Sequence, residues 1–543
     1  MQAVLNLLEI FGSYSGLKMN AEKTKVIWIG CKRHSKDKLK VSMKLTWDER
    51  NFTLLGIKFN TNLEDLSEIN YRNSIMLVEK LLNKWKPRKL TPIGRITVIK
   101  SLALPKLNHL FASIPCSQKI LNEINKLFFS YLWNEKPDKI KGNLAIKPYL
   151  FGGLNMVNVF HFEMALKLSW IKQIVNCKNN PWFLILTAKY PRLSNLITLG
   201  GEWTNALNKE TNPFWKIVFQ YWSNFCKNRK VSCNQDIMNS CLWYNSHVSQ
   251  NLFYPNWYQK GILTVGDVVG IDGKMLTIDI LREHFNLNIN LLNYYTVKSK
   301  VSAFIKKYAS GKFPHKFIQL RPYLPFHANI LFGTKSKSNS FYRTLTQDEH
   351  QREMPTHEQN WNSQLKGQIN NEHWYFYYKA CFKTMKDNSV IWFQYRILGR
   401  ILGTRSYLYK IKMANSNLCG LCGSESETMI HMFTQCPKVK ELWINIFSWI
   451  EHKLSVKLEL DTVAKVLGYP TQNEHFWPLN FILMITKQYI FSCCKNKEKT
   501  NIFSLQQIAK QKFEEQKSLA NVNCQDQLFA KKWALWKDLF IGL

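Results

Sequence analysis

The spacing of four residues close to position 430 constrains the fold of this 543-residue chain more than any other feature of its sequence. Cys419 and Cys422 are separated by two residues, His431 follows after eight more, and Cys436 after a further four. Two cysteines at this separation can chelate one ion from a single turn. A His and a third Cys complete a tetrahedral Cys3His set, which is typical of closed structural zinc sites. We therefore predict a structural Zn2+ site in a small C-terminal domain.

The residues that follow Cys436 favour the same interpretation. Pro437 disfavours helical geometry at Cys436 and suits the first position of a new helix. One face of that helix would be apolar, formed by Val439, Leu442, Trp443, Ile446 and Ile450. Two other interpretations stay open, namely four unrelated core residues or a redox C-x-x-C pair. No βαβ pattern surrounds the cysteine pair, which argues against the redox interpretation.

The charge balance of the chain points to polyanionic partners. The sequence holds 74 Lys and Arg against 38 Asp and Glu, which gives a net charge of +36 at pH 7. Such an excess does not dictate a fold, but it favours nucleic acid as the partner. The 45% share of apolar residues is ordinary for globular proteins. It excludes the disordered, collagen-like and small disulfide-scaffold classes.

No targeting or membrane-spanning segment is evident. Residues 1–11 lack the basic start of a signal peptide, and their apolar residues have the spacing of an amphipathic helix. The most apolar stretch, residues 476–494, is interrupted by Pro478 and Lys487 and fits a buried helix better than a membrane span. The thirteen cysteines are odd in number and mostly scattered, which indicates reduced thiols. We expect a soluble protein of the nucleus, the cytoplasm or both, without a membrane partner.

Changes of pattern along the chain predict a mainly α fold made of five segments. The first segment alternates between helix and strand signals, with strands expected at 24–29 and 52–59, and is typical of the end of a mixed α/β domain. The five segments are 1–65 (mixed α/β), 66–193 (basic and helical), 194–333 (an aromatic-rich helical connector), 334–364 (a polar linker) and 365–543 (the C-terminal domain with the zinc site).

The basic helical segment has a clear helix start. Thr91 suits the N-cap and Pro92 the first helical position. Ile93, Ile96, Ile99 and Ala103 then form an apolar stripe that Pro105 ends, and Arg95 and Lys100 are expected to lie off that stripe.

Positive charge is concentrated in the same segment. Between residues 80 and 147 there are fourteen Lys and Arg against three acids, interleaved with aromatic residues. We favour a nucleic-acid-binding face over the alternative of a solvated helix surface. The candidate contacts are Lys84, Lys86, Arg88, Lys89, Arg95, Lys100 and Lys106.

A second basic and aromatic segment precedes the cysteines. Between residues 391 and 412 there are five basic residues and no acid, and Arg396 and Arg400 are one helical turn apart. Together with Arg405 they suit phosphate contacts, with aromatic residues available for base stacking. The alternative is a helix that exposes its basic face to solvent and packs its aromatic residues inward.

Common catalytic motifs are absent from the sequence. It contains no G-x-x-x-x-G-K-[ST], no G-x-G-x-x-G, no G-x-S-x-G and no Asp-Asp pair. We therefore expect no small-molecule substrate site.

Several of these motifs resemble the C-terminal part of a LINE-type (non-LTR) retrotransposon reverse transcriptase. Residues 15–24 (SGLKMNAEKT) are similar to the motif that follows the catalytic part of the palm, and Leu54-Leu-Gly-Ile57 to the next hairpin. Other matching pieces, in the family's order, are 90–106, 129–134 (FSYLWN), 151–155 (FGGLN), 242–243 with 257–273, 396–405 and the cysteine motif.

The resemblance implies a helical thumb and connector, a small palm remnant at the N-terminal end, and RNA and DNA (template-primer and element RNA) as partners. Polymerases of this family use two metal ions held by aspartates, including a paired-Asp turn that would precede residue 1. We therefore expect this chain to lack polymerase activity by itself, with Mg2+ as a cofactor only if the missing palm is present. Lys23 is similar to a palm lysine that assists pyrophosphate departure, although a surface lysine is the favoured interpretation. The alternatives are a piece of an active RNA-directed DNA polymerase and a host-adopted nucleic-acid-binding module.

Overall fold

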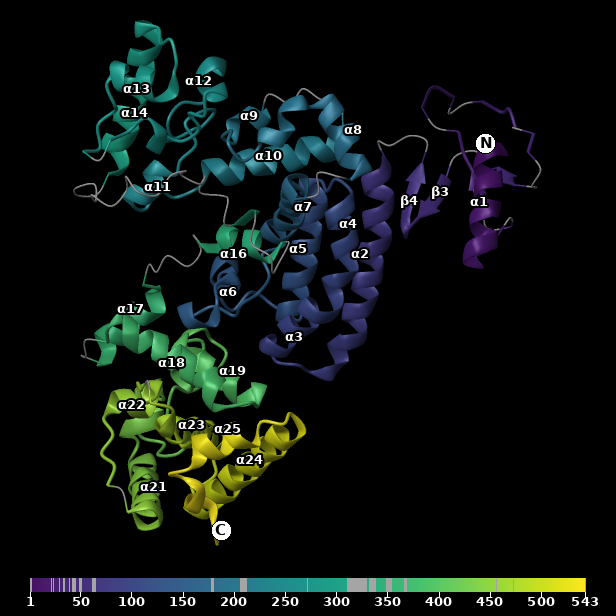
Figure 1. The fold of residues 1–543 in the computed structure, drawn as a ribbon. Coiled ribbons are helices and arrows are strands. Elements are labelled where there is room, and N and C mark those ends of the chain that lie inside the picture. Colours follow the sequence, from purple (N-terminus) through teal and green to yellow (C-terminus); the bar gives the residue numbers. More distant parts are fainter. Residues whose placement is uncertain are drawn as a thin grey trace. The chain divides into compact units, whose positions relative to one another are not determined.

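The computed structural model describes residues 2–542 apart from 21, 23, 29, 33–34, 39, 42–44, 48–50, 61–64, 177–179, 206–211, 271, 310–329, 332–337, 348–353, 366–368, 456 and 472. The described chain is mainly helical, which confirms the predicted fold class (Figure 1). It divides into two compact units. The first comprises Met1–Leu81, Leu102–Lys126 and Asn158–Asp348, and the second comprises Leu82–Ser101, Leu127–Val157 and Glu349–Leu543. The division of the sequence into five segments stays a prediction.

Helices make up most of the first unit, and four short strands lie near its N-terminal end. α2 and α5 begin in this unit and end in the second one. Its helices are α1 (Gln2–Ser15), α2 (Leu66–Trp85), α4 (Pro105–Ser113), α5 (Gln118–Trp133), α7 (Val159–Asn176), α8 (Pro181–Lys189), α9 (Glu202–Asn205), α10 (Pro213–Lys227), α11 (Asn234–Met238), α12 (Pro255–Gln259), α13 (Ile278–Phe285), α14 (Leu291–Tyr308) and α16 (Asn339–Gln347).

The strands form two separate two-stranded sheets. β1 (Lys25–Val26) pairs in parallel with β2 (Thr46–Trp47), and β3 (Asn51–Leu54) pairs antiparallel with β4 (Ile57–Asn60). The single strand predicted for 52–59 is therefore a hairpin. Its turn is at Leu55 and Gly56, which have φ angles of 50° and 81°, and positive φ at both central residues is typical of the tight turns that join paired strands.

The core of the first unit is centred on α7. This helix packs against α4, α10 and α16, and its Lys167 is fully buried. The Lys167 ammonium donates hydrogen bonds to the backbone carbonyls of Phe111 and Ile114 at the end of α4, and lies 3.5 Å from the buried Glu163 carboxylate. A buried lysine of this kind is satisfied by helix-end carbonyls and therefore serves packing.

The second unit carries the cysteine motif and two parts of the basic helical segment, residues 82–101 and 127–157. Its helices are α3 (Pro92–Val98), α6 (Gly142–Ile146), α17 (Thr356–Leu365), α18 (Asn371–Thr384), α19 (Asn388–Leu398), α20 (Arg405–Lys410), α21 (Pro437–Leu454), α22 (Thr462–Leu467), α23 (Trp477–Asn496), α24 (Ile502–Val522) and α25 (Asp526–Trp533).

α3 starts as predicted and ends differently. The Thr91 hydroxyl accepts a hydrogen bond from the Gly94 N–H at 3.3 Å, and Pro92 is the first helical residue. The apolar stripe is buried, but the helix continues into a π-helical turn, Ile99–Ala103, and Pro105 then opens α4 instead of ending the run. Proline is tolerated there because the first N–H groups of a helix have no intrahelical partner.

The FGGLN motif packs against α18 and α19 within the second unit. Gly152 has a φ of 77°, and a β-carbon on it would lie 2.9 Å from the Tyr378 hydroxyl oxygen. The Tyr395 hydroxyl donates a hydrogen bond to the Gly152 carbonyl at 2.7 Å. This motif therefore needs glycine because two tyrosines approach its backbone closely.

α23 is the apolar helix predicted for residues 476–494. Most of its residues are buried, and the ammonium of its Lys487 donates a hydrogen bond to the Val466 carbonyl at 2.9 Å. None of the helices in the described ranges combines the length and apolar character needed to cross a membrane.

Candidate metal centre

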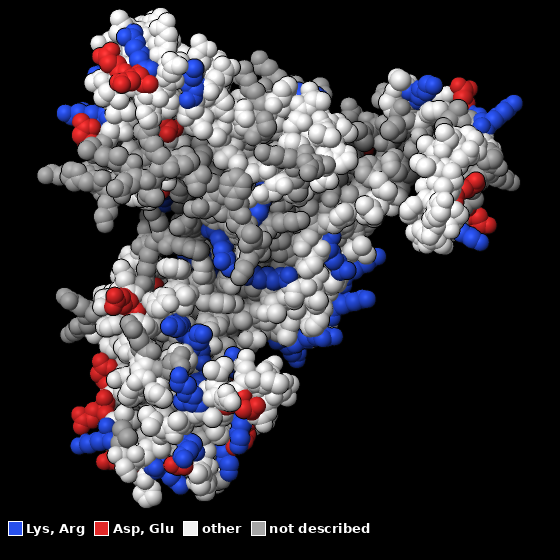
Figure 2. All heavy atoms as spheres, viewed as in Figure 1, with Lys and Arg blue, Asp and Glu red and all other residues white. Residues whose placement is uncertain are grey.

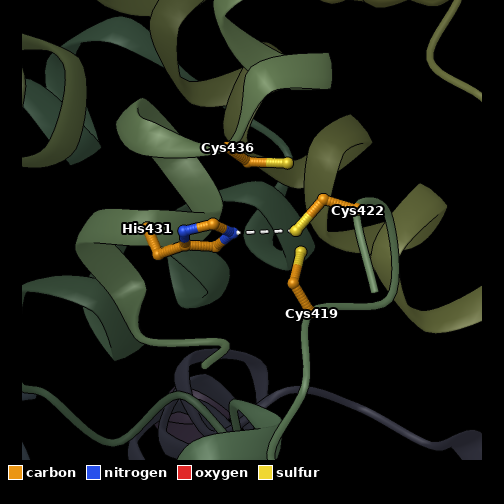
Figure 3. Close-up of side chains that lie close together, drawn as sticks. All are labelled: Cys419, Cys422, His431 and Cys436. Carbon is orange, nitrogen blue, oxygen red and sulfur yellow. Dashed lines mark hydrogen bonds between the residues drawn. The ribbon is translucent and has the colours of Figure 1, made fainter. Parts of the chain in front are cut away.

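The four residues of the cysteine motif come together in the second unit. Cys419 and Cys422 lie on a turn whose ends are joined by an isolated bridge between Leu418 and Ser426. His431 begins the π-helical turn His431–Gln435, and Cys436 directly precedes α21. Figure 3 shows the four side chains pointing toward one another. The predicted proline-led helix is present, and its apolar face is buried.

The geometry of this cluster suits a tetrahedral ion. The three Sγ atoms and one His nitrogen all lie within 4.8 Å of one another, and Cys422 Sγ is 3.4 Å from His431 Nε2. Zinc–sulfur bonds of about 2.3 Å at tetrahedral angles place sulfur atoms ~3.8 Å apart. Cys419, His431 and Cys436 are buried, whereas Cys422 is half-buried, as expected of a closed structural site.

The environment of the cluster favours metal-binding forms of its side chains. Hydrogen bonding from the Cys494 thiol, together with backbone N–H groups, lowers the pKa of Cys419 to about 4. His431 Nδ1 lies 2.8 Å from a carboxylate oxygen of Glu425, which leaves Nε2 directed at the cysteines. A carboxylate behind a ligating histidine commonly orients the ring and raises its basicity.

Burial raises the pKa of Cys436 to about 12, and the neighbouring Cys419 contributes to the rise. Without an ion the cluster therefore holds a mixture of thiolate and thiol. A divalent cation would replace the thiol proton and compensate the negative charge, because metal binding requires deprotonated sulfur.

Glu427 organises the cysteine turn, although no motif or spacing in the sequence predicted this role. Its carboxylate is buried and accepts hydrogen bonds from the Gly420 N–H at 3.0 Å and the Arg405 N–H at 2.9 Å. The Arg405 guanidinium lies 3.7 Å from the same carboxylate and donates to the Leu418 carbonyl at 3.4 Å. Arg405, predicted as a nucleic-acid contact, therefore braces the turn.

Cys494 on α23 is a further thiol that the spacing of the motif did not reveal. Its Sγ, Cys419 Sγ and a Glu427 oxygen lie within 4.8 Å of one another. A residue so far along the chain carries no local spacing signal. The cysteine turn thus packs on α23 as well as on residues that lie close to it in the sequence.

The predicted nucleic-acid contacts differ in how accessible they are. Lys84, Arg88, Lys89 and Lys106 are exposed, and Lys86 forms an ion pair with Glu135. Lys100 is half-buried, and burial lowers its pKa to about 8. Lys106 lies in the first unit, whereas the others lie in the second. Lys23 is outside the described residues.

Arg95 requires a correction, because it does not lie off the buried stripe. Its side chain is 6% exposed, and the guanidinium donates hydrogen bonds to the carbonyls of Leu90 at 3.1 Å and Tyr131 at 2.6 Å. It also lies over the Tyr131 ring, at 5.2 Å from the ring centroid. Its hydrogen-bonding groups are thus used in joining α3 to α5.

Arg396 and Arg400 do not share a helix face as predicted, because α19 ends at Leu398 and Arg400 has a φ of 55° in the turn that follows. The two arginines also differ in their partners. Arg400 donates to the Gln364 side chain at 2.6 Å and lies 4.6 Å from the centroid of the Trp361 ring. Arg396 lies between the rings of Phe393 and Phe491, and no hydrogen bond or ion pair joins its side chain to the rest of the described chain.

Comparison with known proteins agrees with the geometry of the cluster. Residues 337–443 match a family model described as zinc-binding in reverse transcriptase, and this range includes all four residues of the cluster. The chain therefore carries a zinc-binding domain of the class associated with reverse transcriptases.

A curated relative shows a more distant similarity. It is a protein of Arabidopsis thaliana named "Putative ribonuclease H protein", 20% identical over 383 residues, which cover 68% of this chain and 54% of the relative. The chain thus spans about half the length of the curated relative that it matches.

Proposed function

We propose that this chain is the thumb, connector and zinc-bearing C-terminal part of a LINE-type non-LTR reverse transcriptase, and that it binds RNA and DNA without catalysing polymerisation by itself. The observation that carries the proposal is the Cys3His cluster inside the range matched by the reverse-transcriptase zinc-binding model. The order of the other motifs supports it, as does the relative that matches over 68% of the chain.

The proposed role of Zn2+ is structural. Cys419, Cys422, His431 and Cys436 would hold the ion, which would fasten the cysteine turn to the start of α21. Glu427 shapes the turn by binding its backbone N–H groups, and Glu425 orients the histidine ring. The four ligands would fill a tetrahedral shell and leave no position for a substrate.

The proposed nucleic-acid surface lies at the end of α2 and around α3. Figure 2 shows Lys and Arg side chains outnumbering acidic ones over this part of the molecule. Its exposed members are Lys84, Arg88, Lys89, Lys136 and Lys141. Such residues contact phosphates irrespective of base sequence, and therefore would position a template-primer with little sequence preference. Arg95 is left out of the surface because it is buried.

The test is the salt dependence of binding. The zinc-loaded chain is titrated into a labelled RNA–DNA hybrid, and the dissociation constant is measured by fluorescence anisotropy between 50 and 300 mM KCl. We expect affinity to fall steeply with salt, because each neutralised phosphate releases counterions. The triple variant Lys84→Gln, Arg88→Gln, Lys89→Gln should reduce the slope of log affinity against log salt by about 3. Affinity that does not change with salt would contradict the proposal.

A primer-extension assay separates the proposal from the alternative of an active polymerase. The chain is supplied with template-primer, deoxynucleotides and Mg2+, because two-metal phosphoryl transfer needs the ion. We expect binding without extension, since no Asp-Asp pair is present among the 543 residues. Extension by the purified chain would favour the polymerase alternative instead.

A further inference from the structure

Two cations from distant parts of the sequence meet in the second unit. Arg396 is on α19, and Lys139 follows α5 in the chain. The Lys139 ammonium lies 5.9 Å from the centroid of the Trp392 ring, one turn before Arg396 on the same helix. Partial burial lowers the pKa of Lys139, and the positive charges of Arg396 and Lys136 lower it further. Lys139 thus lies against the helix turn that carries Arg396, and its charge is repelled by those of Arg396 and Lys136.

No carboxylate compensates this charge within the described chain. Arg396 and Lys139 take part in no ion pair there, and Asp138, the nearest acid in the sequence, pairs with neither. Lys136 and Lys139 are exposed and Arg396 is half-buried, so an anion from outside the protein can approach these cations.

Arg396 is held in place without using its hydrogen-bonding groups. Its guanidinium carbon is 5.4 Å from the centroid of the Phe393 ring and 5.9 Å from that of Phe491. Its Nε is buried and has no hydrogen-bond partner among the described residues. Buried polar groups are usually paired in native proteins, so the unpaired Nε shows hydrogen-bonding capacity of Arg396 that its contacts in the described chain do not use.

Other arginines of the unit show what a purely structural role looks like. Arg95 donates to two backbone carbonyls, and Arg400 donates to Gln364. Both are fully explained by contacts within the protein. Arg396 is not, although it lies only four residues before Arg400 in the sequence.

We propose that Arg396 and Lys139, with Lys136 at the rim, form a phosphate-binding site that holds one backbone phosphate of a bound nucleic acid. The inference rests on the proposed function, because that function supplies the nucleic acid whose phosphate the site would hold. The planar guanidinium matches phosphate oxygens in a bidentate arrangement, and the ammonium supplies a compact second charge. The Trp392 ring supports the lysine through the contact with its ammonium.

The site is tested by comparing Arg396→Gln with Arg400→Gln in the zinc-loaded chain. Affinity for a labelled RNA–DNA hybrid is measured by anisotropy at several KCl concentrations, and thermal unfolding is recorded in parallel. We expect Arg396→Gln to weaken binding about tenfold at low salt and to reduce the salt slope by about 1, without lowering the melting temperature. Arg396→Lys should recover part of the affinity, and Arg400→Gln should reduce the slope less than Arg396→Gln does, because the Arg400 guanidinium donates to Gln364.

The outcomes separate this site from the proposed function. Steep salt dependence in the unmodified chain with an unchanged slope in Arg396→Gln would overturn the site and leave the function standing. No binding by the unmodified chain would overturn both. Inorganic phosphate is titrated calorimetrically as a second probe. If it binds in an Arg396-dependent manner while the hybrid binds independently of Arg396, the site takes free phosphate and the backbone assignment is wrong.

Discussion

The backbone of Gly420 lies directly against the carbonyl group of Cys494, so that a β-carbon on Gly420 would be 2.1 Å from the Cys494 oxygen. Gly420 is one of the two residues between the first pair of cysteines, and Cys494 is near the end of α23. The glycine therefore allows the cysteine turn to pack directly on this helix.

Gly420→Ala should displace the turn from α23. We expect the free energy of unfolding to fall by about 2–3 kcal/mol, since backbone on both sides of the contact leaves little room to adjust. Urea denaturation monitored by circular dichroism measures the change. The matched control is Gly403→Ala, whose new β-carbon would approach no atom closer than 3.7 Å. Equal stability of the two variants would contradict the role of Gly420.

Cys419→Ser should remove the ion and loosen the C-terminal part of the second unit. Structural zinc contributes directly to folding, so the loss of one ligand lowers both metal content and stability. Zinc content by atomic emission, and amide hydrogen exchange across residues 405–454, report the two effects. Cys524→Ser is the control, because Cys524 is exposed and lies outside the cluster. An unchanged zinc content and melting temperature would show that the cluster does not bind the metal.

Substitutions of Arg95 and Lys84 should affect different properties, the first the stability of the fold and the second the binding of nucleic acid. Arg95→Gln removes hydrogen bonds to two buried carbonyls and should cost about 2 kcal/mol of stability. Lys84→Gln affects an exposed side chain and should leave stability within about 0.5 kcal/mol while reducing the salt slope of nucleic-acid binding by about 1. Thermal unfolding and anisotropy are measured on both variants, and the reverse pattern would contradict the assignment of Arg95 to packing.

Lys487 should make stability depend on pH. Burial lowers the pKa of its ammonium to about 7 in the folded chain, whereas the unfolded chain keeps an ordinary lysine pKa near 10.4. Between these values the unfolded state binds more protons, so stability rises with pH from about 7 upward, by about 1 kcal/mol per unit. Below pH 7 both states are protonated and the contribution is constant.

The pH prediction is checked with Lys487→Met, an apolar residue of similar length. Cys381 on α18 is the titratable group whose charge acts on Lys487, and burial raises its own pKa to about 12, so it stays neutral over the range tested. The difference in unfolding free energy between the two proteins from pH 7 to 9 isolates the lysine. A difference that does not change with pH would mean that Lys487 is charged throughout.

Features with a local signal in the sequence could be predicted. The cysteine spacing predicted a cluster of Cys419, Cys422, His431 and Cys436, and Pro437 predicted the start of a helix. The cluster and the helix, α21, are both present. Each signal involves residues within one or two turns of one another. Backbone geometry over such short distances follows from residue type alone.

Contacts with partners from far along the chain could not be predicted from the sequence. Helical periodicity places Arg95 off the apolar stripe of α3. In the structure its side chain is buried and donates a hydrogen bond to the carbonyl of Tyr131 on α5. Glu427 and Cys494 have no spacing signal, since their partners are a backbone N–H and a thiol on other elements. The residue pattern over 52–59 predicted a single strand because the turn at Leu55 and Gly56 interrupts an otherwise uniform β pattern. Only the resemblance at residues 54–57 pointed to a hairpin there.

The dependence of Gly152 on Tyr378 and Tyr395 has a consequence for synthesis on the ribosome. The FGGLN motif leaves the ribosome more than two hundred residues before the helices that cover it. At translation rates of 5–20 residues per second this corresponds to a delay of roughly 10–40 s. During that interval residues 127–157, which hold four lysines and one tryptophan, have no partner from α18 or α19. This segment therefore stays uncovered by these helices until both have been synthesised.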